Sequence, residues 1–426
     1  MDIKIEKLIY GGDGLAHHDG ATVFVPFVLP GETVSVVPIE KKKKFLRARA
    51  ESILTPAPER IAPRCPYFLF CGGCNYQHMS YESQLKYKEE ILRETLRRLG
   101  KIDWTGPIAA HASPAWGYRN RAQWKVREQK SGGPPQIGYF HAASTALVPV
   151  DECPIVSPKL AETLRALHDL LASGGLSPAL REVEAFVDDK DQALLLTLTY
   201  AKYPKATREV ERVLRDKLPS LASLLIQDTN QQRMELLGPG SVTYKVGDFA
   251  YRVSHLSFFQ VNRYLVEEMA KTVSEMAGSG ELAFDVFAGV GLFSLPLSRQ
   301  FARVIAAEAN PVAARDFSFN AALPENATPG KLEIREMDST DFLRRMKPTP
   351  DCVVLDPPRA GLGTEGVAAL AKIGPKRIVY VSCDPATLAR DLAAMVAAGY
   401  EISVVSLFDL FPQTFHIETL VQLVKR

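Results

Sequence analysis

Apolar runs and amphipathic stretches alternate regularly from residue 255 to the end of the chain. Apolar strand-like runs occupy 281–289, 302–310, 331–338, 351–359, 376–383 and 415–425, with helical spacing between them, as at 292–300, 311–320 and 341–346. Apolar runs that alternate with helices predict a doubly wound parallel sheet of the Rossmann-like α/β class. In such a sheet, ligands bind beyond the carboxyl ends of the strands. We assign 247–426 to this catalytic domain.

The first 55 residues follow a different pattern, with short alternating runs separated by turn signals. Gly11–Gly14, Asp19-Gly20 and Pro30-Gly31 mark turns between strands such as 22–28 and 33–38. Five short strands in this space predict a small closed β-barrel, since closure removes exposed sheet edges. The basic residues of its last segment favour an oligonucleotide-binding barrel over a purely structural module.

Helical and strand patterns are mixed between these two regions. Helices are predicted at 80–99, 158–171 and 206–218, strands at 182–187 and 193–200, and a hairpin at 243–253 around Gly247-Asp248. We assign 56–246 to an α+β middle domain.

Composition and charge narrow the class of protein. The 426 residues carry a net charge of +2, and neither a membrane-length apolar run nor a secretory start is visible. We therefore expect a cytoplasmic protein without a membrane partner, acting as a monomer. Basic clusters at Lys41–Lys44 and between 80 and 130, interleaved with Trp116, Tyr118 and Trp124, favour nucleic acid over a merely solvated face.

Carboxylates follow the apolar strands at successive positions. Asp285 precedes a glycine-rich turn, Glu308 and Asp338 end the next two strands, and Asp356 ends the fourth. A strand-end carboxylate can accept hydrogen bonds from ribose hydroxyls, while the G-x-G-x-x-G run of a nicotinamide site is absent. These acids fit S-adenosylmethionine, a cation without phosphates, better than a dinucleotide.

Cys383 ends the fifth strand, on the same face as Asp356. A cysteine at this edge is inert filling, a metal ligand or a nucleophile, and a thiolate beside a methyl donor could add to carbon 6 of uracil and activate carbon 5. Glu418, on the last strand with His416 on the same face, is a candidate base for the carbon 5 proton, although spacing alone leaves that role open. Cys352, within an apolar strand, is expected to fill the core.

Three further cysteines lie within ten residues, at Cys65, Cys71 and Cys74. Such crowding in a chain without a secretory start indicates metal ligands, and Cys153 is the natural fourth. Four cysteines suit zinc or an iron–sulfur cluster, and an isolated fourth cysteine followed by Pro154 favours iron–sulfur. The spacing differs from that of radical enzymes, so a structural cluster is expected.

Together these motifs resemble the RNA uracil-5 methyltransferases, the 5-methyluridine-forming family that acts on tRNA and 23S rRNA. The resemblance spans almost the whole chain, through "GGDGLA", "CPYFLFCGGCNYQH", "YRNRAQ", "FFQVN", "DVFAGVG", "DPPRAGL", "SCDP" and "HIE". It implies a TRAM barrel at 1–55, a class I methyltransferase domain and a helix 80–99 that packs on that domain. It also implies Cys383 as nucleophile and Glu418 as base, with the cofactor held by Gln260, Phe287, Glu308, Asp338 and Asp356, and a 4Fe–4S cluster held by Cys65, Cys71, Cys74 and Cys153.

The substrate expected from the resemblance is 23S rRNA, because tRNA-specific members commonly lack the barrel and the cluster. The same chemistry on tRNA is the first alternative. A radical methylthiotransferase and a non-catalytic RNA-binding or assembly factor are the other two.

Overall fold

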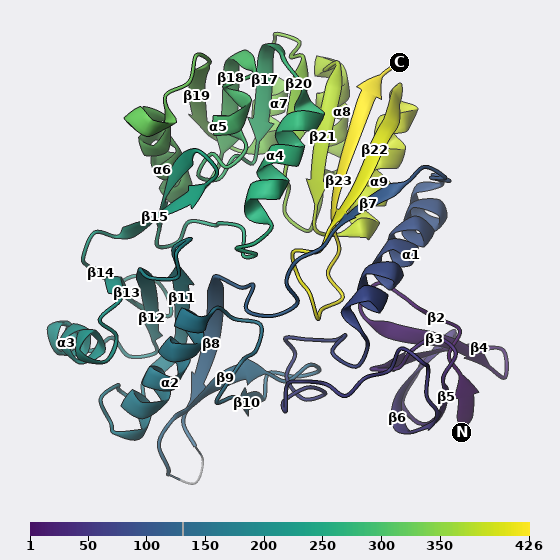
Figure 1. Ribbon diagram of the computed structural model, residues 1–426, viewed down its shortest axis with the longest axis vertical. Coiled ribbons are helices and arrows are strands. Elements are labelled where there is room, and N and C mark those ends of the chain that lie inside the picture. Colours follow the sequence, from purple (N-terminus) through teal and green to yellow (C-terminus); the bar gives the residue numbers. More distant parts are fainter. Residues whose placement is uncertain (130–131) are drawn as a thin grey trace.

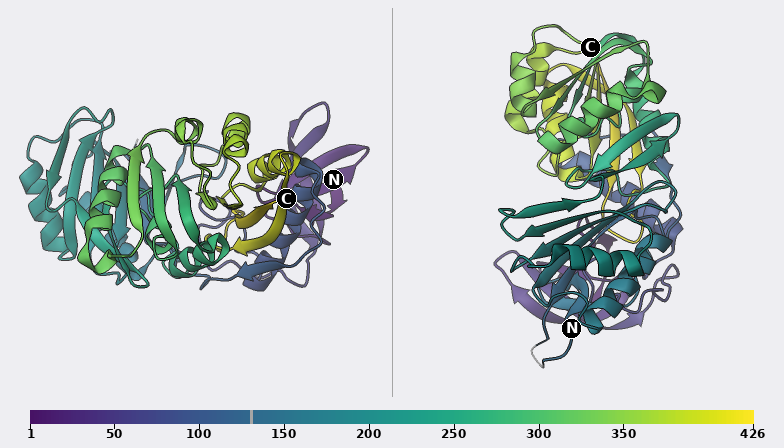
Figure 2. Two further views of the ribbon diagram at one scale, coloured as in Figure 1. Left: turned by 90° about the horizontal axis from the view of Figure 1, so that it is seen from above. Right: turned by 90° about the vertical axis from the view of Figure 1, so that its left-hand side faces the viewer.

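The computed structural model describes residues 1–129 and 132–426, so Lys130, the last residue of the second basic stretch, lies outside the described residues. Three bodies are visible in Figure 1: the C-terminal domain at the top, the middle domain at the lower left and the N-terminal barrel at the lower right. In the right-hand view of Figure 2 the barrel lies behind the middle domain. Among the helices of the described residues, none is both long enough and apolar enough to span a bilayer.

The N-terminal domain is a curled sheet of six strands, in the order β1-β5-β6-β4-β3-β2. Its two edge strands, β1 and β2, are consecutive in the chain, and the residues between them bond to both ends of the sheet, Ile5 N–H to Glu32 O and Glu6 N–H to Leu15 O, each at 2.9 Å. The predicted number of five strands was wrong because the first segment is split at this corner. The strands are β1 (Asp2–Lys4), β2 (Lys7–Leu8), β3 (Asp13–His18), β4 (Ala21–Pro26), β5 (Thr33–Lys41) and β6 (Phe45–Thr55).

The middle domain is built on a mixed seven-stranded sheet, in the order β10-β9-β8-β11-β12-β13-β14. Helices α2 (Pro158–Ala172) and α3 (Thr207–Lys217) contribute their apolar sides to its core. The strands are β8 (Arg121–Arg127), β9 (Gln136–Phe140), β10 (Leu147–Pro149), β11 (Leu180–Val187), β12 (Leu194–Tyr200), β13 (Leu221–Asp228) and β14 (Met234–Leu237).

Two aromatic residues expected to face nucleic acid are instead buried. Trp124 and Tyr118 have no exposed surface, and Trp124 lies in the core of the middle domain. In β8 the apolar side chains at 122, 124 and 126 point inward, so only the alternate, polar positions remain available to a partner. The interleaving of Trp124 with basic residues therefore reflects the alternation of buried and exposed positions in a β-strand, and not an aromatic surface for nucleic acid.

The C-terminal domain is an eight-stranded sheet, in the order β19-β18-β17-β20-β21-β23-β22-β7. Strands β17 to β21 are parallel, while β23 runs antiparallel to both of its neighbours. The expectation of a wholly parallel sheet was wrong at this end, where the unpredicted strand β22 follows α9. The strands are β7 (Ile108–His111), β17 (Gly280–Val286), β18 (Phe301–Glu308), β19 (Lys331–Glu336), β20 (Cys352–Leu355), β21 (Arg377–Ser382), β22 (Tyr400–Phe408) and β23 (Glu418–Lys425).

Helices cover both faces of this sheet (Figure 1). Strand side chains alternate between two buried clusters, with Phe284 and Tyr380 in one and Cys352 and Val354 in the other. The predicted helix 292–300 is a single turn at 294–297, since Pro296 removes a backbone donor. The helices are α4 (Val266–Ala277), α5 (Ser294–Leu297), α6 (Pro311–Ala322), α7 (Ser339–Arg345), α8 (Gly363–Ile373) and α9 (Pro385–Ala397), with a 3-10 turn, η1 (Pro324–Asn326).

Two segments from the first half of the chain belong structurally to the C-terminal domain. Helix α1 (Tyr81–Gly100), capped by Ser80, packs on α9 so closely that a Cβ at Gly100 would lie 2.8 Å from the carbonyl oxygen of Ala389. Strand β7 pairs with β22 at the sheet edge. The hairpin of β15 (Ser241–Val246) and β16 (Phe249–Ser254) packs on α6, so the border predicted at 246/247 falls in its turn.

Candidate active site

The glycine-rich loop leaves β17 at the point where the strand order of the sheet reverses, between β17 and β20. Phe287 has a φ of +72°, a strained left-handed conformation for a residue with a side chain, and Gly289 and Gly291 follow at +55° and +96°. Glu308, at the end of β18, accepts the N–H of Gly289 at 2.8 Å and that of Asn310 at 2.7 Å. Each oxygen of this carboxylate keeps a lone pair for a further donor, as binding of a ribose requires.

Gln260 and Asp356 lie across from this loop. They line one narrow cavity together with Phe287, and the Gln260 amide donates to Asp356 Oδ2 at 3.4 Å. Burial, and then the charge of Asp285, raises the pKa of Asp356 to about 7. The structure therefore brings three of the five predicted cofactor residues, Gln260, Phe287 and Asp356, to one cavity. Glu308, a fourth, bonds to the glycine-rich loop at Gly289.

Asp338 has a different environment. It is exposed and caps α7, accepting the N–H groups of Thr340 and Asp341 at 2.8 and 3.2 Å. This cap explains an acidic residue after β19 without a ligand. Asp285, one of the strand-end acids noted in the sequence but not one of the five predicted cofactor residues, is buried and accepts the Ser294 hydroxyl. Its pKa is raised to about 7 by burial and then by the charge of Glu308. Its position in the quoted motif was the available signal.

Cys383 and Glu418 face each other across neighbouring strands. Ser382, the last residue of β21, pairs with Thr419 of the antiparallel strand β23, so the next position in this register places Cys383 opposite Glu418. Asp384 follows and caps α9 through the N–H groups of Ala386 and Thr387, both at 2.9 Å. The nucleophile candidate is thus fixed between a strand and a helix.

The electrostatic environment of this pair is acidic. Burial, then Glu418, then Asp356 raise the pKa of the Cys383 thiol to about 12, and Arg359 opposes them. Burial and then Asp356 raise the pKa of Glu418 well above its ordinary value. Burial lowers the pKa of His416 to about 4, so this imidazole is neutral at pH 7. Cys383, Glu418 and Asp356 therefore share one site.

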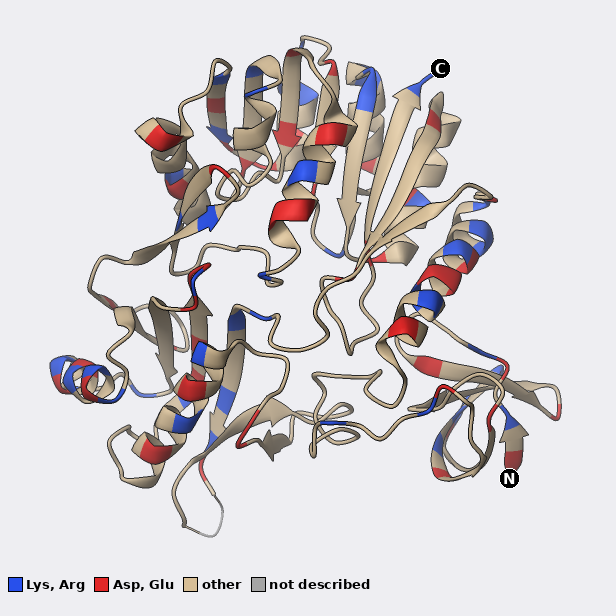
Figure 3. Cartoon of the chain, in the orientation of Figure 1, with Lys and Arg blue, Asp and Glu red and all other residues tan. Residues whose placement is uncertain are grey.

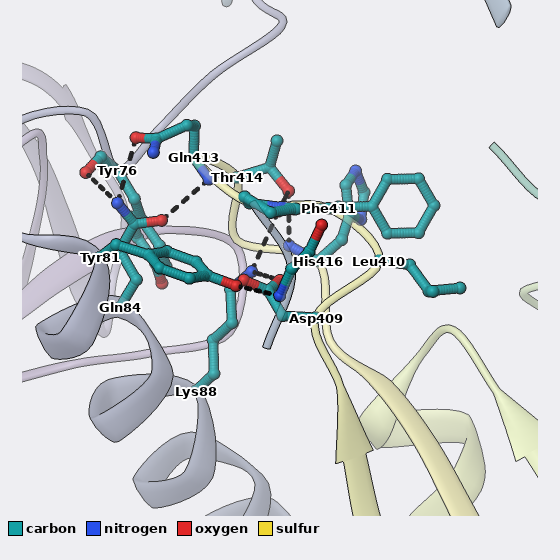
Figure 4. A network of polar contacts seen from close by, with 12 residues as sticks. Tyr76, Tyr81, Gln84, Lys88, Asp409, Leu410, Phe411, Gln413, Thr414 and His416 are labelled. Carbon is teal, nitrogen blue, oxygen red and sulfur yellow. Dashed lines mark hydrogen bonds and ion pairs between the residues drawn. The ribbon is translucent and has the colours of Figure 1, made fainter. Parts of the chain in front are cut away.

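The loop from 409 to 417, which leads into Glu418, is held by α1 (Figure 4). Lys88 and Asp409 form a fully buried ion pair at 2.6 Å, and Lys88 also donates to the carbonyl of Phe411 at 3.1 Å. The Gln84 side chain accepts the backbone N–H of Gln413 at 2.8 Å and donates to its side chain at 3.1 Å. These contacts, between residues 321 to 329 positions apart, explain why helix α1 packs here, and the sequence offered no sign of them.

The four remaining cysteine candidates, Cys65, Cys71, Cys74 and Cys153, line one cavity of about 260 Å³ in the middle domain. Burial, together with the charges of Cys153 and Cys65, raises the pKa of Cys71 to about 11. Within residues 1–129 and 132–426, no three Cys, His, Asp or Glu side chains are gathered as around a metal ion. Four thiols around a cavity of this size leave room for a group larger than one ion. Cys352, in contrast, is fully buried in the catalytic sheet, as core filling requires.

Known proteins share this architecture over the full length of the chain. Residues 80–426 match the family described as tRNA (Uracil-5-)-methyltransferase, and residues 1–50 match the TRAM domain. The chain is 34% identical to the 23S rRNA (uracil(1939)-C(5))-methyltransferase RlmD of Klebsiella pneumoniae, over 100% of this chain and 96% of that protein. It is also 34% identical to an uncharacterized RNA methyltransferase of Aquifex aeolicus, over 99% and 97%.

A solved structure is similar to this chain over its full length. The Pyrococcus abyssi tRNA (uracil-54, C5)-methyltransferase, in complex with S-adenosyl-L-homocysteine, is similar with a TM-score of 0.76 and 25% identity, over 100% of both chains. The chain therefore belongs to the RNA uracil-5 methyltransferases, the class I S-adenosylmethionine-dependent enzymes that methylate carbon 5 of uridine in RNA, and it carries an N-terminal TRAM domain.

Proposed function

We propose that this enzyme methylates a uridine of 23S rRNA, with Cys383 as the nucleophile and Glu418 as the base. The observation that supports these roles is the register of β21 and β23, which sets the two side chains opposite each other beside Asp356. The Cys383 thiol gives up its proton to solvent, and the resulting thiolate forms a bond to carbon 6 of the uracil. The π electrons displaced from the double bond between carbons 5 and 6 make carbon 5 nucleophilic.

Glu418 acts at the second stage. After carbon 5 has been methylated, it still carries its original proton. The ionised form of Glu418, a stronger base because its pKa is raised, takes that proton while the bond between sulfur and carbon 6 breaks. This restores the double bond and frees Cys383. Bound S-adenosylmethionine would supply the methyl group from a sulfonium, and Gln260, Phe287, Glu308 and Asp356 would hold it. Asp338 is a less central candidate, because it is exposed and does not line the cavity of Gln260, Phe287 and Asp356.

The choice of 23S rRNA rests on the named relatives and not on the architecture. Several relatives, 31–34% identical over nearly their whole length, are named 23S rRNA uracil-1939 methyltransferases. The P. abyssi enzyme is named for tRNA and aligns with the whole of this chain, barrel included. The presence of the barrel therefore does not distinguish the two substrates. Exposed Lys41, Lys43 and Lys44, at the β5–β6 turn, are candidates for contacts to RNA phosphates.

The test is nucleoside mass spectrometry after reaction with labelled S-adenosylmethionine and either unmodified 23S rRNA or tRNA. We expect 5-methyluridine in the rRNA, none with Cys383→Ala, and a stable RNA–protein adduct with Glu418→Gln, which cannot remove the proton. Cys352→Ala, a substitution of a core thiol, is the matched control and should retain activity. Label confined to tRNA would reject the substrate, and methylation by Cys383→Ala would reject the mechanism.

We propose in addition that Cys65, Cys71, Cys74 and Cys153 hold a 4Fe–4S cluster. The cavity that the four cysteines share supports a common ligand, and an isolated fourth cysteine followed by Pro154 favours iron–sulfur over zinc. Protein purified without air should contain about four irons and sulfides, and Cys71→Ser should lose them while Cys352→Ala retains them. One zinc and no iron per chain would contradict the assignment.

A further inference from the structure

The turn between β2 and β3 of the barrel reaches the active site. The hydroxyl of Tyr10, in this turn, donates to the carbonyl oxygen of Cys383 at 3.3 Å. The ring of the same residue packs edge-on against Phe415, with 5.6 Å between the ring centroids. One side chain of the barrel therefore contacts both the strand end that carries Cys383 and the segment that leads, three residues later, to Glu418.

The packing of the barrel against the rest of the protein fixes the position of this turn. Gly12 has a φ of +94°, and a Cβ there would lie 3.3 Å from Cβ of Asn75 and 3.5 Å from Cβ of Phe415, so the turn fits closely against both. Leu8 is 3% exposed and belongs to the same buried cluster as residues of α1, and Lys7 pairs with Glu94 of that helix. The turn is thus fixed against α1 on one side and against the loop from 409 to 417 on the other.

The surroundings of Tyr10 make its hydroxyl a hydrogen-bond donor. Burial, then Asp384, then Cys383 raise the pKa of this phenol, while Arg359 opposes them. It therefore stays protonated and can hold the Cys383 carbonyl. That carbonyl lies immediately before the cap of α9, so its position sets the direction from which the thiol faces Glu418.

We propose that Tyr10 is a positioning residue of the methyl transfer, through which the RNA-binding barrel sets the geometry of Cys383 and of the segment before Glu418. The inference rests on the proposed roles of these two residues. It gives the barrel a second task besides binding RNA, since it completes the support of the nucleophile.

The test separates catalysis from binding. Tyr10→Phe keeps the ring on Phe415 and removes only the hydroxyl, so it should lower the single-turnover rate about five- to tenfold, as expected for one neutral hydrogen bond, with the Kd for RNA within twofold of wild type. Tyr10→Ala should lower the rate further. Tyr203→Phe loses a comparable hydroxyl, bonded to Glu235 in the middle domain, and should change neither value.

Two outcomes would overturn the proposal. A weaker Kd with an unchanged rate would make Tyr10 an RNA contact, and no change in either value would make it a packing residue. Denaturation midpoints of the variants show that each one folds. The yield of covalent adduct with RNA containing 5-fluorouridine, whose carbon 5 has no proton to lose, should fall in Tyr10→Phe within a fixed short reaction time. Loss of activity in Cys383→Ala is measured alongside, so a failure of the proposed mechanism is recognised independently of Tyr10.

Discussion

The buried carboxylates beside the glycine loop should make the affinity for S-adenosylmethionine depend on pH. The pKa of Asp356 is raised to about 7, so its carboxyl group is neutral below that pH and charged above it. A cation binds better to the charged form. Affinity should therefore rise as the pH rises through 7 and level off above it.

The size of the effect follows from the pKa. A carboxyl group with a pKa of 7 is ionised in about one molecule in eleven at pH 6 and in about ten in eleven at pH 8, so a ligand that requires the carboxylate binds about tenfold more tightly at pH 8. Asp285, whose pKa is also raised to about 7, should steepen the dependence. Asp356→Asn should weaken binding at pH 8 and remove much of the slope.

Isothermal titration calorimetry at pH 6, 7 and 8 measures this directly, and buffers of different ionisation enthalpy count the protons released on binding. S-adenosylhomocysteine, which lacks the sulfonium charge, is the matched ligand and should show a shallower dependence. Equal affinity for S-adenosylmethionine at pH 6 and pH 8 would refute the reasoning, as would an unchanged slope in Asp356→Asn.

Two further predictions concern the nucleophile and the loop before the base. Lys88→Met should destabilise the protein by about 3–5 kcal/mol, because it leaves Asp409 buried without its partner. Urea denaturation measures this loss. As a control, Lys86→Met, at an exposed position of the same helix, should change stability by less than about 0.5 kcal/mol. Because the pKa of Cys383 is raised to about 12, its alkylation by iodoacetamide should accelerate about tenfold per pH unit from pH 8 to 10. Peptide mass spectrometry follows the reaction, and a rate that levels off near pH 9 would contradict the raised pKa.

The β/α alternation was readable from sequence because buried parallel strands are continuous apolar runs that end at fixed points. Cys383 and Asp356 could be placed at strand ends for this reason, and the structure sets both beside one site. The pairing of Cys383 with Glu418 could not be read in the same way. It depends on β23 being inserted antiparallel between β21 and β22, and the sequence assigned no strand to 400–408.

Charge was the weaker guide, because a count of basic residues does not show which of them are paired. Figure 3 shows Lys and Arg alternating with Asp and Glu along α1. Arg93 pairs with Glu89, and Arg98 with Glu94. The basic stretch that begins at residue 80 is thus largely a helix with its own i,i+4 ion pairs, each worth only a few tenths of a kcal/mol. Exposed lysines at the β5–β6 turn are the better candidates for an RNA-binding surface.

The support of the active site comes from parts of the chain that no local pattern connects with it. Asn75 and Tyr76, directly after Cys74, both donate their N–H groups to the carbonyl of Gln413, at 2.9 and 3.0 Å, and Gln413 lies five residues before Glu418. A turn of the barrel, the cysteine segment and α1 thus converge on one loop. Each contact joins residues about 300 or more positions apart and leaves no periodicity in the sequence. Because these segments hold the loop on different sides, a substitution that disrupts the packing of the cysteine segment or of the barrel should disturb the position of Glu418. The catalytic sheet itself should stay intact.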